Sequence, residues 1–246
     1  MAHKEREIAI LEYLQGKREA SVTELCRALF VSEATMRRDL AALNRSGRIL
    51  RTHGGAVFRS EPCENLPQTV REREHTDAKV TIAKKCLSLI NDGDTVMLDA
   101  SSTAFELLKR IGEKSAVVVV TNSAKAALAL AETGVKTFVS GGELVNSSYA
   151  YVGSHAEEFL RGFNADVCFF SVRTLTLDGR LTDNAIAENA VRRVMLSRAR
   201  RRVLMLDSQK LGAPCMHTLC ELDGVSDVVS ECDISDAFPA YREKFL

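Results

Sequence analysis

The chain has 246 residues, of which 46% are hydrophobic and 27% charged, and its 33 basic side chains balance 33 acidic ones. This composition is typical of a globular protein and excludes a disordered, fibrous or membrane-spanning chain. The length indicates two domains, and the polar start of the chain lacks the apolar core of a signal peptide, so we expect a cytoplasmic protein.

The cysteines and histidines give no sign of a metal site or of a disulfide framework. The seven cysteines include no Cys-x-x-Cys pair, and the five histidines lack the spacing of metal ligands. We therefore expect most cysteines to be small buried side chains in a reducing compartment, and we expect neither a metal nor another cofactor.

Charge is distributed unevenly along the chain. Residues 1–60 contain 11 Lys and Arg against 7 Asp and Glu, whereas the remaining residues contain 22 against 26. A basic first segment on an acidic body favours a polyanionic partner for that segment, although a solvated surface gives the same count.

Residues 1–59 predict a winged helix-turn-helix domain. Apolar side chains at helical spacing predict a helix over 4–15, ended by Gly16. A second helix is expected from Ser21, because Ser21 and Glu24 form a capping-box pattern. A third helix is expected over 32–44. The expected buried side chains of this third helix are Met36, Leu40 and Leu43.

A glycine-rich hairpin follows the third helix and would form the wing. Residues 48–52 and 56–59 flank the turn 53–55. In this fold the third helix enters the major groove, where arginine reads guanine and hydroxyl groups reach bases or phosphates. Helical spacing alone leaves open a three-helix protein-interaction module with solvated arginines.

Residues 21–57 resemble the DNA-binding domain of the DeoR family of bacterial transcription regulators. The resemblance is carried by VSEATMRRDL and by the following LRTHGGA. It implies a recognition helix that begins near Ser32 and a wing at 53–55. The candidate DNA-binding residues are Ser21, Ser32, Thr35, Arg37, Arg38, Arg51, His53, Gly54 and Gly55.

Residues 60–77 are polar, contain two prolines and predict a linker. Residues 78–246 alternate apolar runs with helical segments, which predicts a mostly parallel α/β domain with both sheet faces covered. The expected strands are 95–99, 116–121, 136–140, 166–171, 202–207 and 227–230, and the expected helices are 78–90, 103–111, 123–132, 155–160 and 185–200.

Small polar residues follow the predicted strands, at the sheet edge where ligands of parallel sheets bind. Hydroxyl groups at helix starts suit an anion, glycines allow close backbone approach, and a lysine supplies positive charge. Each residue could also be a helix cap, but their convergence favours a phosphorylated small molecule. The candidate effector-binding residues are Asp99, Ser101, Ser102, Thr103, Thr121, Asn122, Ser123, Gly141, Gly142 and Lys210.

The segments LDASST, VTNS, SGG, LTDNAIAEN and LDSQKLG, in this order, also resemble the DeoR-family effector domain, so the resemblance covers nearly the whole chain. That domain is similar to sugar-phosphate isomerases such as ribose-5-phosphate isomerase, which implies a Rossmann-like fold and a phosphorylated sugar or sugar derivative as effector. Asp183 and Glu188 also match family positions. The chain departs from the family where Ser101 replaces a glycine and where glycines common around Ser171 and Thr174 are missing.

The sequence thus predicts a DNA-binding transcriptional regulator, by default a repressor of carbohydrate-metabolism genes, controlled by a phosphorylated sugar. We expect double-stranded operator DNA and the sugar phosphate as partners, a homodimer or tetramer, and no membrane association. The alternative is a sugar-phosphate isomerase with a DNA-binding module, for which Asp99, Asp183, Glu188 and Lys210 are candidate acids and bases by residue type. We expect no catalytic residues, because the acidic loop of those isomerases is not evident at 172–179.

Overall fold

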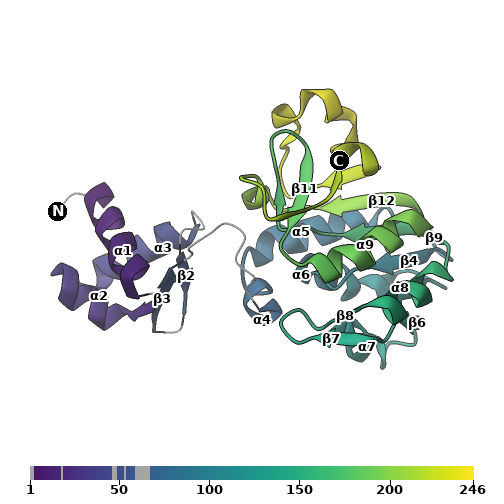
Figure 1. Ribbon diagram of the computed structural model, residues 1–246, viewed down its shortest axis with the longest axis horizontal. Coiled ribbons are helices and arrows are strands. Elements are labelled where there is room, and N and C mark those ends of the chain that lie inside the picture. Colours follow the sequence, from purple (N-terminus) through teal and green to yellow (C-terminus); the bar gives the residue numbers. More distant parts are fainter. Residues whose placement is uncertain (1–2, 18, 46–48, 53, 59–66) are drawn as a thin grey trace. The chain divides into compact units, whose positions relative to one another are not determined.

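The structure is a computed structural model. It divides into two compact units, Met1–Glu64 and Asn65–Leu246, whose elements are labelled in Figure 1. No helix among the described residues is both long and apolar enough to cross a membrane. The described residues are 3–17, 19–45, 49–52, 54–58 and 67–246.

The first unit has the predicted order of helices followed by a hairpin. Met36, Leu40 and Leu43 are buried, which confirms the predicted core face of the third helix. The first helix continues past Gly16, where the sequence predicted its end. Residues 48, 53 and 59 of the predicted wing lie outside the described residues. The elements are α1 (His3–Lys17), β1 (Glu19–Ser21), α2 (Val22–Leu29), α3 (Glu33–Arg45), β2 (Ile49–Arg51) and β3 (Gly55–Phe58).

Local hydrogen bonds fix both ends of α2. The Ser21 hydroxyl accepts the Glu24 backbone N–H at 3.1 Å, and the Ser21 N–H donates to Glu24 Oε2 at 2.8 Å, so the predicted capping box is present. At the other end Phe30 adopts a left-handed conformation with φ 54°, and its ring is 96% exposed. A left-handed residue ends a helix and redirects the chain, here into α3.

The hairpin is joined by a strand that the sequence did not predict. β2 and β3 pair antiparallel, with Arg51 opposite Ala56, and β1 pairs with the other edge of β3, with Ser21 opposite Gly55. A Cβ atom at Gly55 would lie 2.2 Å from the Ala20 carbonyl oxygen. Gly55 is therefore required by the close approach of β1.

Replacing Gly55 with alanine should destabilise the first unit by about 1–3 kcal/mol, because the added methyl cannot fit without moving the backbone of β1. Gly54→Ala is the matched control, since a Cβ atom there meets nothing within 4 Å. Hydrogen–deuterium exchange of the β1, β2 and β3 amides in the intact chain measures the difference. Equal protection in both variants would contradict the close approach.

The second unit is built on a parallel sheet with strand order β14-β12-β9-β4-β5-β6. Its six strands and five of its helices coincide with the predicted elements, which confirms the mostly parallel α/β fold. The strands are β4 (Thr95–Leu98), β5 (Val118–Thr121), β6 (Lys136–Val139), β9 (Ala165–Phe170), β12 (Ala199–Met205) and β14 (Asp227–Val229). The helices are α4 (Gln68–Arg71), α5 (Thr76–Leu87), α6 (Ser102–Leu108), α7 (Ala124–Leu130), α8 (Ser154–Arg161) and α9 (Ile186–Arg198).

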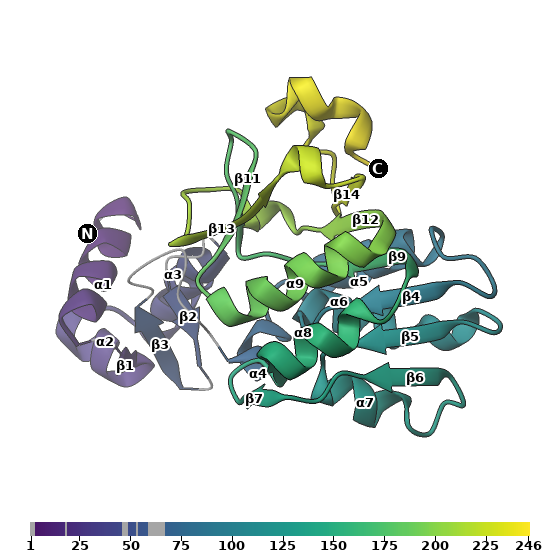
Figure 2. The ribbon, with the colours of Figure 1, turned by 45° about the vertical axis from the view of Figure 1, so that its right-hand side comes forward.

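Both faces of this sheet are covered by helices (Figure 2). Successive strand residues point to opposite faces. Met97 of β4 therefore packs in the cluster that contains Leu160 of α8 and Met195 of α9, whereas Leu98 packs in the cluster that contains Leu107 of α6 and Ile82 of α5. The carboxyl edge of the sheet is thus held between two helical layers.

Shorter elements at this edge were not predicted. A hairpin and a small antiparallel sheet of order β10-β11-β13 add to the parallel sheet. Their strands have two to five residues, too few to show a clear hydrophobic period. They are β7 (Glu143–Val145), β8 (Ala150–Val152), β10 (Thr174–Leu175), β11 (Arg180–Asp183) and β13 (His217–Glu221). The 3₁₀ turns are η1 (Ile111–Glu113), η2 (Ser208–Lys210), η3 (Leu222–Gly224), η4 (Ser235–Ala237) and η5 (Pro239–Lys244).

The described part of the predicted linker is folded. Residues 67–77 contain α4 and the start of α5. Gln68 is 1% exposed, and its backbone N–H donates to the Ser147 carbonyl oxygen at 2.6 Å. A four-residue helix without an apolar stripe leaves no period in the sequence, so composition alone suggested a linker here.

The cysteines partly follow the expectation. Cys86 and Cys168 are buried free thiols, and burial raises the pKa of each. Cys215 is disulfide-bonded, which the scattered spacing of the cysteines did not predict.

Candidate functional site

Arg37 and Arg38 of α3 lie on its exposed face. Arg37 Nη2 is 3.3 Å from Glu33 Oε2 one turn earlier, and both side chains are more than half exposed, so this ion pair is weak. Arg38 is exposed, and among the described residues no hydrogen bond or ion pair engages it. The Ser32 hydroxyl accepts the Thr35 N–H at 3.4 Å and lies 3.0 Å from Thr35 Oγ1 at the start of the helix.

Asp39 follows these arginines in the sequence and has a structural role that sequence analysis missed. It is 1% exposed, and Arg6 of α1 donates to both of its carboxylate oxygens, at 2.8 and 3.3 Å. The pair ties α1 to α3 and so orients the helix that carries Arg37 and Arg38. The signal in the sequence is a carboxylate between core positions, one residue before Leu40.

The other candidate DNA-binding residues divide by exposure. Arg51 and Gly54 are exposed, and the backbone N–H of Arg51 donates to Asn44 Oδ1 at 2.9 Å. Gly55 is buried against β1, and the Ser21 hydroxyl is engaged in the capping box. His53 lies outside the described residues.

Arg38→Ala should weaken binding to a DNA fragment that the wild type selects from a random pool. A base-reading arginine should cost about 1–3 kcal/mol and relax specificity, whereas a phosphate-contacting arginine should weaken all sequences alike and reduce the salt dependence. Gel-shift titrations at several salt concentrations distinguish the two. Arg161→Ala, an exposed arginine of the second unit, is the charge-matched control. Unchanged affinity and salt slope for Arg38→Ala would contradict a recognition-helix role.

In the second unit, Arg192 of α9 is the centre of a buried ion-pair network. Its Nε lies 2.9 Å from Asp99 Oδ2, its Nη1 3.2 Å from Asp183 Oδ2, and its Nη2 3.3 Å from Glu188 Oε2. Burial alone would lower the pKa of Arg192, but the three carboxylates outweigh burial and raise it. Burial would likewise raise the pKa of Asp183, and the Arg192 charge outweighs this, so that pKa is lowered.

This network gives Asp99 a positioning role. Asp99 Oδ1 accepts the Ser101 N–H at 3.1 Å, and Oδ2 accepts the Ser171 N–H at 3.3 Å, so one carboxylate holds the loops after β4 and β9. Asp99, Asp183 and Glu188 were three of the four candidate acids and bases of the isomerase alternative, and Lys210 was the fourth. All three carboxylates contact Arg192, and for Asp183 the lowered pKa makes the carboxylate a weaker base.

Several predicted hydroxyl groups are satisfied within the protein. Ser101 accepts the Ala104 N–H at 3.1 Å as the N-cap of α6, and Ser123 accepts the Ala126 N–H at 3.2 Å as the N-cap of α7. Thr121 donates to the Leu98 carbonyl oxygen at 2.7 Å. These three side chains therefore shape the strand ends.

Two other buried groups at the same strand ends have unused hydrogen-bonding capacity. Thr103 is 0% exposed, and among the described residues nothing hydrogen-bonds its hydroxyl. Asn122 donates to the Tyr151 carbonyl oxygen at 3.0 Å, but its Oδ1 has no partner there. Because β4 and β5 are adjacent, both groups lie at one sheet edge. A buried polar atom without a partner is costly, so it marks a place for a ligand or water.

The predicted glycines and lysine also lie at strand ends. Gly142 has φ 110°, and a Cβ atom there would lie 2.6 Å from the Val152 carbonyl oxygen, so β8 requires the glycine. Gly141 has φ 63° and open space around it. Lys210 in η2 donates to the Ser171 hydroxyl at 2.8 Å. Ser171 thus positions the ammonium group of Lys210, the candidate cation.

A second lysine, Lys79 of α5, lies near Lys210 and was not predicted. It is 3% exposed, and its ammonium group donates to the carbonyl oxygens of Glu74, at 2.7 Å, and of Arg71. Burial, together with the positive charge of Lys210, lowers the pKa of Lys79 to about 8. Lys79 and Lys210 are therefore near enough for their charges to interact, and an anion bound beside them would favour their protonated forms.

The pKa of Lys79 makes a testable contribution to stability. Between about 8 and the ordinary value of 10.5, the unfolded chain binds more protons than the folded protein, so this contribution rises with pH. From pH 7 to 10, the free energy of unfolding of the wild type should gain about 2–3 kcal/mol relative to Lys79→Met, because one pKa unit corresponds to about 1.4 kcal/mol. Urea unfolding across this range measures the gain. A difference independent of pH would contradict the lowered pKa.

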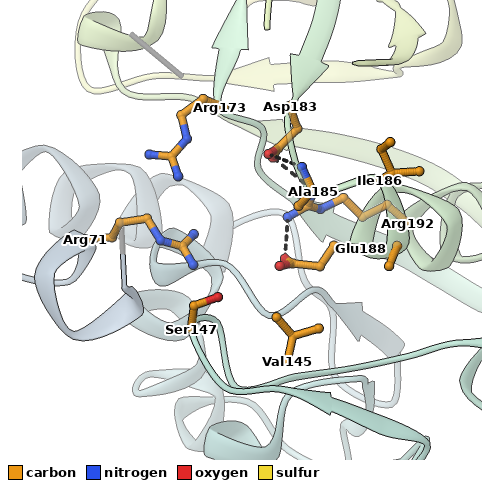
Figure 3. Close-up of a pocket in the computed structure, with 10 residues that line it drawn as sticks. Arg71, Val145, Ser147, Arg173, Asp183, Ala185, Ile186, Glu188 and Arg192 are labelled. Atoms are coloured by element: carbon orange, nitrogen blue, oxygen red, sulfur yellow. Dashed lines mark hydrogen bonds and ion pairs between the residues drawn. The ribbon is translucent and has the colours of Figure 1, made fainter. Parts of the chain in front are cut away.

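A pocket of about 170 Å³ opens at this edge (Figure 3). Sequence analysis missed its three arginines, which are Arg71 in the predicted linker, Arg173 after β9 and Arg192 of α9. Among the described residues, no group of three or more His, Cys, Asp or Glu side chains is placed to hold a metal ion. The lining residues are Arg71, Val145, Ser147, Arg173, Asp183, Ala185, Ile186, Ala187, Glu188 and Arg192.

Comparison with known proteins matches each unit to a described domain. Residues 6–61 match the DeoR-like helix-turn-helix domain, and residues 74–231 match the DeoR C-terminal sensor domain. The HTH-type transcriptional regulator GolR of Listeria innocua is 30% identical over 234 residues, which cover 95% of this chain and 92% of GolR. The transcriptional repressor AccR of Agrobacterium fabrum is 28% identical over 243 residues, which cover 98% of this chain and 94% of AccR.

Solved structures resemble the fold at low identity. Translation initiation factor eIF-2B of Pyrococcus horikoshii has a TM-score of 0.50 and 16% identity, covering 94% of this chain and 82% of that one. Ribose 5-phosphate isomerase A of Methanocaldococcus jannaschii has a TM-score of 0.44 and 17% identity, covering 56% of each chain. Neither resemblance bears on activity.

A winged helix-turn-helix unit joined to an α/β sensor unit defines a DNA-binding transcriptional regulator. The chain belongs to the DeoR family, because the sensor-domain match alone covers more than half of its residues.

Proposed function

We propose that this regulator is a repressor of carbohydrate-metabolism genes whose DNA binding is controlled by a phosphorylated sugar at the carboxyl edge of the parallel sheet. The repressor role is supported by the name of AccR, a relative along nearly the whole chain. We further propose that the protein binds operator DNA as a homodimer or tetramer, because two recognition helices then read two half-sites.

The observation that carries the ligand proposal is the pair of unsatisfied buried groups, Thr103 Oγ1 and Asn122 Oδ1, at adjacent strand ends. At the same edge the Lys210 ammonium donates to the Ser171 hydroxyl. The backbone N–H of Ser171 in turn donates to the Asp99 carboxylate. A phosphate can accept hydrogen bonds from the Thr103 hydroxyl and from the Lys210 ammonium group. A hydroxyl of the sugar can donate to Asn122 Oδ1.

The carboxylates of the pocket favour binding over turnover. Asp183 and Glu188, which line the pocket, and Asp99, which does not, are each within 3.3 Å of Arg192, which orients them. Such groups can accept hydrogen bonds from sugar hydroxyls without removing a proton from carbon. Incubation with pentose and hexose phosphates should therefore give thermal stabilisation without isomerisation, and measurable turnover would favour the enzyme instead.

Thr103→Val tests the ligand site with little change of shape. Without ligand the variant should be as stable as the wild type or more so, because it removes a buried hydroxyl that lacks a partner. The stabilising sugar phosphate should bind about tenfold more weakly, since one hydrogen bond to a charged group contributes about 1.5–3 kcal/mol. Thermal shift titration measures both effects. Unchanged affinity would place the phosphate elsewhere.

Ser102→Glu should abolish the effect of the sugar phosphate on DNA binding, because a carboxylate then occupies the place of the phosphate and repels it. Operator binding should survive, since the DNA-binding residues belong to the other unit. Ser154→Glu, at the exposed start of α8, is the matched control and should respond normally. Gel shifts with and without the sugar phosphate report the outcome. A normal response in Ser102→Glu would remove this loop from the proposed site.

A further inference from the structure

The pocket beside the proposed phosphate position has two walls of opposite charge. Figure 3 shows the side chains of Arg71, from α4, and Arg173, from the segment between β9 and β10, pointing into one space. Asp183 and Glu188 face them across that space. The two arginines come from segments about a hundred residues apart in the chain, so the fold itself brings them together.

The acidic wall has little capacity left for a cation. Besides Arg192, Asp183 Oδ1 accepts the N–H groups of Asn184 at 2.8 Å and Ala185 at 3.1 Å. Glu188 contacts Arg192 at 3.3 Å. The arginine wall carries two positive charges, and a guanidinium presents its N–H donors in a planar fork that matches a carboxylate or a phosphate. The pocket is therefore better suited to an anion on the arginine side than to a cation on the acidic side.

The arginine wall is continuous with the proposed phosphate position. Arg173 follows Ser171 by two residues, and Ser171 holds the Lys210 ammonium at 2.8 Å. Burial lowers the pKa of Lys210 despite the opposing charge of Asp207, and the positive charges of Arg173 and Arg71 lower it further. A ligand anchored near Lys210 can thus extend towards both arginines.

An unsatisfied side chain on α4 supports a ligand at this wall. Gln68 is 1% exposed, and neither atom of its side-chain amide has a hydrogen-bond partner among the described residues. It lies one turn before Arg71, and its backbone is bonded to Ser147, which lines the pocket. Gln68 does not itself line the pocket, but α4 thus carries a buried amide with unused hydrogen bonds one turn from the pocket wall.

We propose that the effector carries a second anionic group, a carboxylate or a second phosphate, which Arg71 and Arg173 bind while its phosphate lies at the strand ends. The effector is then a phosphorylated sugar acid or a sugar bisphosphate rather than a neutral sugar monophosphate. This inference rests on the proposed function, since it assigns the far end of the same ligand. Arg173 determines the specificity for the second anionic group. Arg71 also binds that group and thereby connects the ligand to α4.

The test compares ligands that differ only in the second charge. Thermal shift titrations of the full chain use pentose and hexose monophosphates, the matching aldonic acid phosphates and the matching bisphosphates. For at least one sugar, an acid or bisphosphate should bind the wild type at least tenfold more tightly than its monophosphate. Equal affinity across each matched set overturns the second anion but leaves the proposed function standing. No stabilisation by any sugar phosphate overturns both.

Variants assign the effect to the arginines. Arg173→Gln and Arg71→Gln should each remove the preference for the second charge and change monophosphate affinity by less than threefold. Arg173→Lys should keep part of the preference, because it retains the charge and loses the planar fork. Arg161→Gln, exposed on α8, is the control and should retain the full preference. If Arg173→Gln lowers the melting temperature without ligand and keeps the preference, the arginine only balances Asp183 and the proposal is wrong.

Discussion

Arg192 reaches from α9 to the carboxyl edge of the sheet and binds carboxylates that follow β4 and end β11, as well as Glu188 on its own helix. Removing one member of such a buried network leaves an uncompensated charge, which typically costs several kcal/mol. The loops after β4 and β9 depend on the network because both donate backbone N–H groups to Asp99. Any ligand at this edge therefore meets loops whose position a single guanidinium determines.

The same arrangement separates residues that build the edge from residues that remain able to bind. Ser101 and Ser123 are used as helix caps, and Gly142 is needed for the approach of β8. Thr103 and Asn122 retain free hydrogen-bonding capacity. Loops rich in small polar residues look uniform in the sequence, but only some of their side chains have unused hydrogen-bonding capacity among the described residues. Burial and hydrogen-bond satisfaction make that distinction, and both are properties of the folded chain.

The sequence was sufficient for elements that repeat a local pattern. The parallel strands are apolar runs, α3 has an apolar stripe, and α2 starts with Ser21 and Glu24, so periodicity and capping chemistry locate them. It was insufficient for β1, a three-residue strand defined only by its pairing with β3. The sequence was also insufficient to predict that Arg71 and Arg173 line one pocket. Their proximity depends on how α4 packs against the loop at Ser147. Long-range convergence of this kind leaves no period in the sequence.

Control of DNA binding requires that the effector favour one arrangement of the regulator over another, since a ligand with equal affinity for both shifts nothing. α4 is the first helix of the second unit and thus the one nearest along the chain to the DNA-binding unit. It carries both Gln68, with its unsatisfied amide, and Arg71, in the wall of the pocket. A ligand bound by these side chains stabilises the folded position of α4 by the free energy of its contacts there. This stabilisation can differ between the two arrangements of the regulator. Each 1.4 kcal/mol of difference changes the operator affinity by about a factor of ten.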